Sequence, residues 1–214
     1  MQYKKEDYEK LLKGTTTIGI VCSDGVVMAA DKRATEGTFI ASSETRKVWK
    51  IDNNLAMTIA GGLGDAQELI RILKAQNEIY KMNENKPLSP KSATSMLATL
   101  LQENRMYPFF VGLLIGGIDD SENQLFSMDP VGGYTQESKF ASIGSGESLA
   151  LGYLEDHYEK SITTKEAMKL AAKALSIAMK RDSATGDGMI IATITKAGYT
   201  EYTGKDIEKL LSSK

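Results

Sequence analysis

The order of strand-like and helix-like segments constrains the fold of this chain more strongly than any other feature of its sequence. Runs rich in β-branched residues come first and two helical segments follow, then strands and two further helices come again before a final pair of strands. Parallel α/β folds alternate strands with helices one by one, which this chain does not do. We therefore predict antiparallel sheets.

Turn residues separate the predicted strands and mark the hairpins. Ser23–Gly25 is a turn signal between the first two strands, and the residues of Asp52–Asn54 tolerate the backbone of a second hairpin. The strands are predicted at residues 15–21, 26–31, 47–51, 55–61, 109–118, 125–130, 139–144, 188–195 and 198–203.

Capping residues and apolar stripes mark the predicted helices. Asp65, with Glu68 three residues later, is expected to cap the first helix, and Ser89, followed by Pro90, is expected to cap the second. The other helices are predicted at residues 148–158, from Thr163 or Thr164 to about Arg181, and at the C-terminus.

The strand runs are apolar enough to be buried on both faces. Two antiparallel sheets packed face to face, with helix pairs outside them, would bury such strands. The predicted fold is therefore α+β, a four-layer αββα sandwich. No linker rich in Pro, Gly and Ser divides the 214 residues, so a single domain is expected.

Charge and hydropathy argue against two classes of partner. The 26 basic and 28 acidic side chains leave a net charge of -2, so no basic field favours nucleic acid. The most continuous apolar stretch, around residues 111–118, is far shorter than the roughly 20 residues of a membrane helix. We therefore expect no nucleic acid and no membrane as partner. Residues 1–14 lack the apolar region of a secretory signal and Cys22 is the only cysteine, which favours a cytoplasmic location.

Histidine and cysteine are too scarce for several hydrolytic mechanisms. Zinc sites built from these residues need more ligands than Cys22 and His157 supply, and a catalytic triad would have to use His157 itself. His157 lies among charged residues of a predicted helix, where a solvated role is expected. We predict no metal and no cofactor, and a hydrolase built from this chain needs a base other than histidine.

A glycine stands directly before three threonines in KGTTTIG, residues 13–19. Threonine favours strands, so the run by itself is typical of a strand start. Gly14, however, removes a side chain where a backbone carbonyl would approach a nucleophile, and it tolerates strained backbone. Further motifs follow in order: MAADKRAT at 28–35, RKVWKI at 46–51, AGGLGDAQ at 60–67, and SIGSG at 142–146 with RDSATGDG at 181–188.

These motifs span nearly the whole chain and together resemble those of proteasome β subunits, particularly the archaeal type. The resemblance implies the N-terminal-nucleophile hydrolase fold and a threonine endopeptidase. It also implies autolytic cleavage between Gly14 and Thr15, so that residues 1–14 are a propeptide and residues 15–214 the catalytic domain. Thr15 would be the nucleophile, and its freed α-amino group, with a reference pKa of roughly 7.7 to 8.0, would be the base.

The resemblance implies roles for other positions as well. Lys47, held in place by Asp31, would stand beside the Thr15 hydroxyl, and Gly61 would donate its N–H to the oxyanion. The family often has serine where this chain has Thr185, which keeps the hydroxyl and adds a methyl group. The residues expected to orient the amine and a water are Ser145, Asp182 and Thr185, and the substrate-binding residues are Ala34, Thr35, Thr45, Trp49, Ile59, Leu63 and Gln67.

The expected substrates follow from the same resemblance. The substrate-binding set is mostly apolar, so we predict a chymotrypsin-like preference for cleavage after hydrophobic residues. Thr35 and residues 61–63 would hold the substrate as an added antiparallel strand, which recognises main chain and leads us to expect broad tolerance of unfolded polypeptides. The implied partners are proteasome α subunits, other β subunits in heptameric rings, and an unfolding ATPase.

Two other functions stay open from the sequence. An N-terminal-nucleophile amidase of a small molecule would share the amine base but use a closed pocket, and the segments expected to clamp a substrate strand argue against it. A catalytically silent ring subunit would typically lack Thr15, Lys47 or the cleavable Gly14, and this chain has all three. The bacterial ATP-dependent relative has a very short leader, unlike residues 1–14.

Overall fold

The computed structural model describes residues 14–212, in which the strands form two five-stranded antiparallel sheets. In spatial order the first sheet contains β10 (Phe140–Gly144), β1 (Thr16–Val21), β2 (Gly25–Asp31), β11 (Met189–Thr195) and β12 (Gly198–Thr203). The second contains β5 (Val48–Asp52), β6 (Leu55–Gly61), β7 (Val111–Ile118), β8 (Asn123–Met128) and β9 (Tyr134–Gln136). A separate hairpin pairs β3 (Ala34–Glu36) with β4 (Phe39–Ser42).

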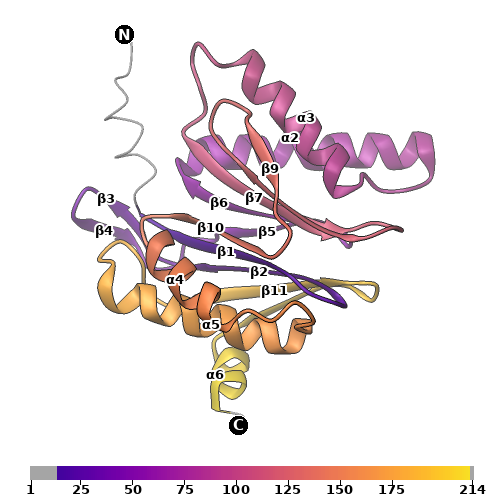
Figure 1. Ribbon diagram of the computed structural model, residues 1–214. Coiled ribbons are helices and arrows are strands. Elements are labelled where there is room, and N and C mark those ends of the chain that lie inside the picture. Colours follow the sequence, from indigo (N-terminus) through magenta and orange to yellow (C-terminus); the bar gives the residue numbers. More distant parts are fainter. Residues whose placement is uncertain (1–13, 213–214) are drawn as a thin grey trace.

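The helices lie on the outer faces of the two stacked sheets (Figure 1). The second sheet is covered by α2 (Leu63–Glu84) and α3 (Pro90–Glu103), and the first by α4 (Glu147–His157) and α5 (Thr164–Arg181). A short helix, α6 (Lys205–Ser212), follows the last strand. The predicted four-layer αββα arrangement is therefore confirmed. Within residues 14–212, no helix is long and apolar enough to cross a membrane.

Local capping signals fix the start of two helices as expected. The Ser89 hydroxyl accepts a hydrogen bond of 3.1 Å from the Ser92 backbone N–H, and Pro90 occupies the first helical position of α3. At α5, Thr163 and Glu166 form a capping box in which each side chain accepts a hydrogen bond from the other residue's backbone. These helices begin where short-range hydrogen bonds satisfy their first N–H groups.

The predicted capping role of Asp65 is wrong. Helix α2 begins at Leu63, with Gly62 as the residue before it, and Asp65 lies inside the first turn. Its carboxylate instead accepts a hydrogen bond of 2.8 Å from the backbone N–H of Phe110, just before β7. A partner so far along the chain cannot be read from a local capping pattern.

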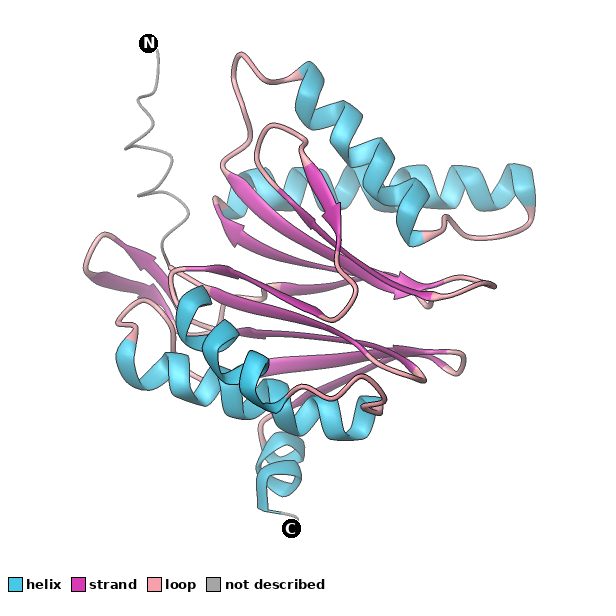
Figure 2. Cartoon of the chain, viewed as in Figure 1, coloured by secondary structure: helices cyan, strands magenta, loops and turns pink. Residues whose placement is uncertain are grey.

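Three short strands carry no clear signal in the sequence. The hairpin of β3 and β4, and strand β9, are each three or four residues long and largely exposed. Phe39 on β4 is 70% exposed. Strand prediction relies on an alternation between a buried and an exposed face, which these segments do not have. Figure 2 shows the β3–β4 hairpin projecting from the stacked sheets.

The apolar core occupies three layers, as the four-layer fold requires. One buried cluster lies between the two sheets and includes Met28, Leu114 and Leu125. The other two lie between each sheet and its helices: Phe126 of β8 packs in the cluster under α2 and α3, and Leu175 of α5 packs in the cluster against the first sheet. The central strands are buried on both faces and are therefore held rigidly by close packing. The candidate site lies at the ends of these strands.

Candidate active site

Thr15 directly precedes β1, and the pairing of that strand determines its surroundings. Strand β1 runs antiparallel to both β2 and β10, so the start of β1 lies beside the ends of those strands. Strand β11 also pairs with β2, and Met189 lies opposite Asp31. Four strand ends therefore meet at one end of the first sheet: the starts of β1 and β11 and the ends of β2 and β10.

The buried hydroxyl of Thr15 contacts the peptide group that precedes it. Thr15 Oγ1 donates a hydrogen bond of 2.7 Å to the carbonyl oxygen of Gly14. Gly14 has a φ of 143°, and a Cβ atom built on it would lie 2.7 Å from Thr35 Oγ1. Both the backbone conformation and the close approach of Thr35 therefore require glycine at this position.

Asp31, at the end of β2, is a fully buried carboxylate with a complete set of hydrogen bonds. Its oxygens accept three backbone N–H groups, from Thr16, Arg33 and Gly186, each at 3.0 Å. The ammonium of Lys47 donates a fourth at 2.9 Å. These donors offset the loss of hydration that a buried carboxylate suffers.

Lys47 connects Asp31 to the peptide group before Thr15. Its ammonium is buried and donates to the carbonyl oxygen of Gly14 at 3.1 Å, in addition to Asp31 and the carbonyl oxygen of Arg33. Burial lowers the pKa of Lys47 below its ordinary value of 10.5, and the Asp31 carboxylate opposes this effect. A cation held here favours negative charge on the carbonyl oxygen.

A second group of hydroxyls surrounds the backbone of Thr15 and Thr16. The carboxylate of Asp182 accepts hydrogen bonds of 2.5 Å from both Ser145 Oγ and Thr185 Oγ1. Ser145 Oγ also lies 3.3 Å from the carbonyl oxygen of Thr15, and Thr185 Oγ1 lies 2.7 Å from Thr16 Oγ1. The structure thus brings Ser145, Asp182 and Thr185 together beside Thr15.

An ion pair that the sequence reasoning missed holds the loop before β11. The guanidinium of Arg33 binds both carboxylate oxygens of Asp187, at 2.7 Å and 3.1 Å, and donates to the Ser183 carbonyl at 2.8 Å. A Cβ atom on Gly186 would lie 2.4 Å from the guanidinium. This Arg33–Asp187 clamp sets the Gly186 N–H against Asp31. The available signal was one basic and one acidic residue, Arg33 in the motif at 28–35 and Asp187 in the motif at 181–188. Neither motif shows by itself that these two residues form a pair.

A small cavity of about 80 Å³ adjoins Thr15, and we call it the specificity cavity. Its lining includes Gly61 and five of the predicted substrate-binding residues. Two others lie elsewhere: Gln67 is exposed on α2, and Trp49 packs against the core cluster under α2 and α3. Arg46 and Ala66 line the cavity without having been predicted. The complete lining is Gly14, Thr15, Ala34, Thr35, Thr45, Arg46, Lys47, Ile59, Gly61, Leu63 and Ala66.

The chemistry available at this site is nucleophilic attack on a carbonyl carbon. A hydroxyl, a buried cation and several hydrogen-bond donors and acceptors converge on it. Across residues 14–212, no group of three or more His, Cys, Asp or Glu side chains is arranged to hold a metal ion. His157, stacked on Tyr153 at the far end of α4, lies outside this set of residues.

Comparisons with known proteins agree with these features. The model of the proteasome subunit family matches residues 11–194. The "Proteasome subunit beta" of Methanohalophilus mahii is 45% identical over 207 residues, which cover 97% of this chain and 99% of that protein. That of Methanococcus vannielii is 47% identical over 207 residues (96% and 94%), and that of Ferroglobus placidus 45% over 204 residues (95% and 97%).

Proposed function

The chain belongs to the proteasome subunit family, and from this membership we propose that it is a catalytic β subunit, a threonine endopeptidase whose nucleophile is Thr15. One observation carries the proposal. The Thr15 hydroxyl and the Lys47 ammonium both contact the carbonyl oxygen of Gly14, so a nucleophile and a cation meet at one peptide group. Family membership implies assembly with other proteasome subunits.

The first reaction in this proposal is cleavage of the chain itself. Thr15 Oγ1 attacks the carbonyl carbon of Gly14, and the Gly14–Thr15 C–N bond breaks as the hydroxyl proton passes to the departing nitrogen. Water then hydrolyses the ester, which leaves a carboxylate on Gly14 and a free α-amine on Thr15. Residues 1–14 would be the released propeptide. Residues 1–13 lie outside the described part of the chain.

The freed amine then serves as the base for substrate cleavage. It accepts the hydroxyl proton as Thr15 Oγ1 attacks the scissile carbonyl, and it donates a proton to the leaving nitrogen before water hydrolyses the acyl ester. Lys47 stabilises negative charge, with Asp31 holding its ammonium in place. The Gly61 N–H is proposed to bind the oxyanion, a contact that is typically worth about 3 kcal/mol. Ser145, Asp182 and Thr185 would orient the amine and the water.

The specificity cavity supports cleavage after hydrophobic residues. Its side chains include Ala34, Ile59 and Leu63, and its one exposed cation is already paired, because Arg46 binds both carboxylate oxygens of Glu201 at 2.7 Å and 2.9 Å. We propose that the substrate adds as a strand along Thr35 and the 61–63 backbone. Faster turnover of a peptide ending in Asp than of one ending in Phe or Leu would contradict this preference.

The wider setting is proposed on family membership. Heptameric β rings stacked between α rings would enclose Thr15, and an unfolding ATPase would deliver unfolded polypeptides. A cytoplasmic location stays a prediction from the sequence. The complete set of contacts around Thr15 favours a catalytic subunit over a silent one. Thr35 lies in the short β3 strand and lines the specificity cavity, and a strand of polypeptide could add beside it, which favours a polypeptide over a small amide.

Replacement of Thr15 by alanine tests the proposal. In the full chain assembled with α subunits, Thr15→Ala is expected to abolish both the cleavage after Gly14 and peptide hydrolysis. Thr17→Val is a matched control, because the Thr17 hydroxyl is buried and has no hydrogen-bond partner within residues 14–212. The readouts are intact mass and hydrolysis of fluorogenic peptides. Full peptidase activity in the Thr15→Ala protein would contradict the proposal.

A further inference from the structure

A second and larger cavity, of about 830 Å³, lies next to the proposed catalytic residues. We call it the leaving-side cavity. It is formed by residues of β6 to β10, the turn at residues 129–133, and the first turn of α4. Ser145 is the one proposed catalytic residue in its lining. The cavity itself has no role in the function proposed so far.

Thr15 lies between the two cavities. Ala60 lines the leaving-side cavity and Gly61, the next residue of β6, lines the specificity cavity. Ser145, on the edge of the leaving-side cavity, approaches the Thr15 carbonyl at 3.3 Å. A polypeptide that places the residue before the scissile bond in the specificity cavity must continue past Thr15 with the residues after that bond. The leaving-side cavity is adjacent to Thr15 through Ser145 and is separate from the specificity cavity.

The lining of this cavity combines apolar surface, the hydroxyls of Ser127, Thr135 and Ser145, and two carboxylates, and it contains no basic residue. Met128, Tyr134 and Ile143 supply apolar surface, and the charged lining residues are Asp129 and Glu147. The carboxylate of Asp129 accepts hydrogen bonds from backbone N–H groups of its own turn, at 2.9 Å and 2.8 Å. Both bonds fall on Oδ1, so the turn at residues 129–133 holds the Asp129 side chain in place.

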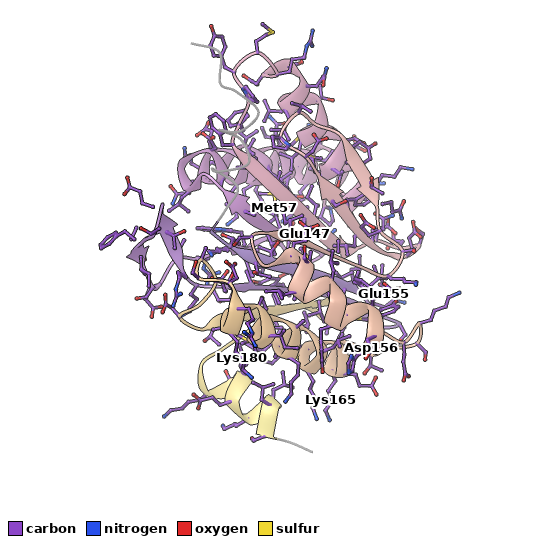
Figure 3. All side chains as sticks on the ribbon, turned by 60° about the vertical axis from the view of Figure 1, so that its left-hand side comes forward. Met57, Glu147, Glu155, Asp156, Lys165 and Lys180 are labelled. Atoms are coloured by element: carbon purple, nitrogen blue, oxygen red, sulfur yellow. The ribbon has the colours of Figure 1, made fainter. Side chains whose placement is uncertain are left out.

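Glu147 is the carboxylate in the lining that is not held by its own turn. It is half-buried at the start of α4, and within residues 14–212 it takes part in no ion pair or side-chain hydrogen bond. Desolvation by burial raises the pKa of this group, and no neighbouring cation compensates for it. Figure 3 shows Glu147 at the end of α4 nearest the second sheet, whereas Glu155 and Asp156 lie at the other end.

We propose that the leaving-side cavity binds the substrate residues that follow the scissile bond, and that Glu147 selects lysine or arginine among them. The inference rests on the proposed endopeptidase function. A long basic side chain lays its methylene groups against the apolar wall and brings its charge to the carboxylate. A half-buried pair of this kind is expected to change kcat/KM about three- to tenfold.

Internally quenched peptides test this selectivity in the assembled particle. The peptides share one sequence before the scissile bond and carry Lys, Gln or Glu at the first two positions after it. The wild type is expected to cleave the Lys peptide with a kcat/KM about three- to tenfold above that of the Glu peptide. Glu147→Gln should bring the ratio close to one, and Glu147→Lys should invert it. Mass analysis of the products identifies the bond that is cut.

Glu155→Gln is the matched control, because Glu155 is an exposed carboxylate on the same helix, with 71% of its side chain exposed. This variant should keep the wild-type ratio. A ratio near one in the wild type, or a Lys preference that survives in Glu147→Gln, would overturn the inference. A short fluorogenic peptide with no residues after the scissile bond separates the two proposals, because wild-type protein that fails to cleave it contradicts the endopeptidase function itself.

Discussion

The Thr15 hydroxyl donates a hydrogen bond of 2.7 Å to the carbonyl oxygen of Gly14, the residue directly before it. The Lys47 ammonium donates to the same oxygen at 3.1 Å. While the Gly14–Thr15 bond is intact, the nitrogen of Thr15 is an amide and cannot act as a base. Under the proposed function, Thr15 in the intact chain is a latent nucleophile, and its hydroxyl contacts the peptide group that the proposed self-cleavage would break.

Removal of the Lys47 charge is expected to cost both stability and activity. Lys47→Met leaves the fully buried Asp31 carboxylate without its cation, which should lower the free energy of unfolding by about 3 to 5 kcal/mol. The double variant Asp31→Asn/Lys47→Met should recover part of that stability but no activity, since the charge beside Thr15 stays absent. Urea unfolding and peptide hydrolysis measure the two effects. Equal stability of the single and double variants would contradict the pairing.

The pH dependence of kcat/KM should be bell-shaped in the cleaved enzyme. The rate rises as the Thr15 α-amine loses its proton, around a reference pKa of roughly 7.7 to 8.0. It falls again as Lys47 loses its proton, at a pH below 10.5 because burial lowers the pKa of this lysine. The measurement is peptide hydrolysis from pH 6 to about pH 11, within the range where the particle stays assembled. Activity that stays level through the alkaline range would show that the Lys47 charge is not needed.

The Arg33–Asp187 clamp should position the loop that carries Thr185 and Gly186. Arg33→Lys and Asp187→Asn each break the two-point contact, and each is expected to lower the free energy of unfolding and to reduce kcat more than KM. The double variant should be no worse than either single one, so the two losses should be clearly non-additive in a double-mutant cycle. Strictly additive losses would show that the two side chains act independently.

Glu201 should keep the specificity cavity from accepting acidic residues. Glu201→Gln removes the carboxylate that holds Arg46, and leaves a guanidinium beside the cavity without its counter-charge. The ratio of cleavage after Asp to cleavage after Phe is expected to rise several-fold. Glu208→Gln, on the exposed surface of α6, serves as the control. An unchanged ratio in Glu201→Gln would mean that Arg46 does not face the bound side chain.

The elements that were predicted correctly are those with local signals. Ser89 and Thr163 cap their helices through partners three residues away, and the hairpin at Ser23–Gly25 depends on its own turn residues. Asp65 has a similar local pattern, yet its carboxylate binds Phe110 at the start of another strand. A local pattern indicates which hydrogen-bond partners a side chain could have. The packing of distant segments determines which of these partners it binds.

Residue type and spacing were enough to predict the long strands and the helices in their order, the scarcity of histidine and cysteine, and the motifs that contain Thr15, Lys47 and Asp31. These follow from residue type and spacing along the chain. Spacing could not predict that Gly186 donates to Asp31 across 155 residues, that Arg33 binds Asp187, or that one cavity is lined by Thr15 and a second by Ser145. Hydrogen bonds and ion pairs depend on distances in space, and those distances are set by strand pairing and sheet packing rather than by separation along the chain.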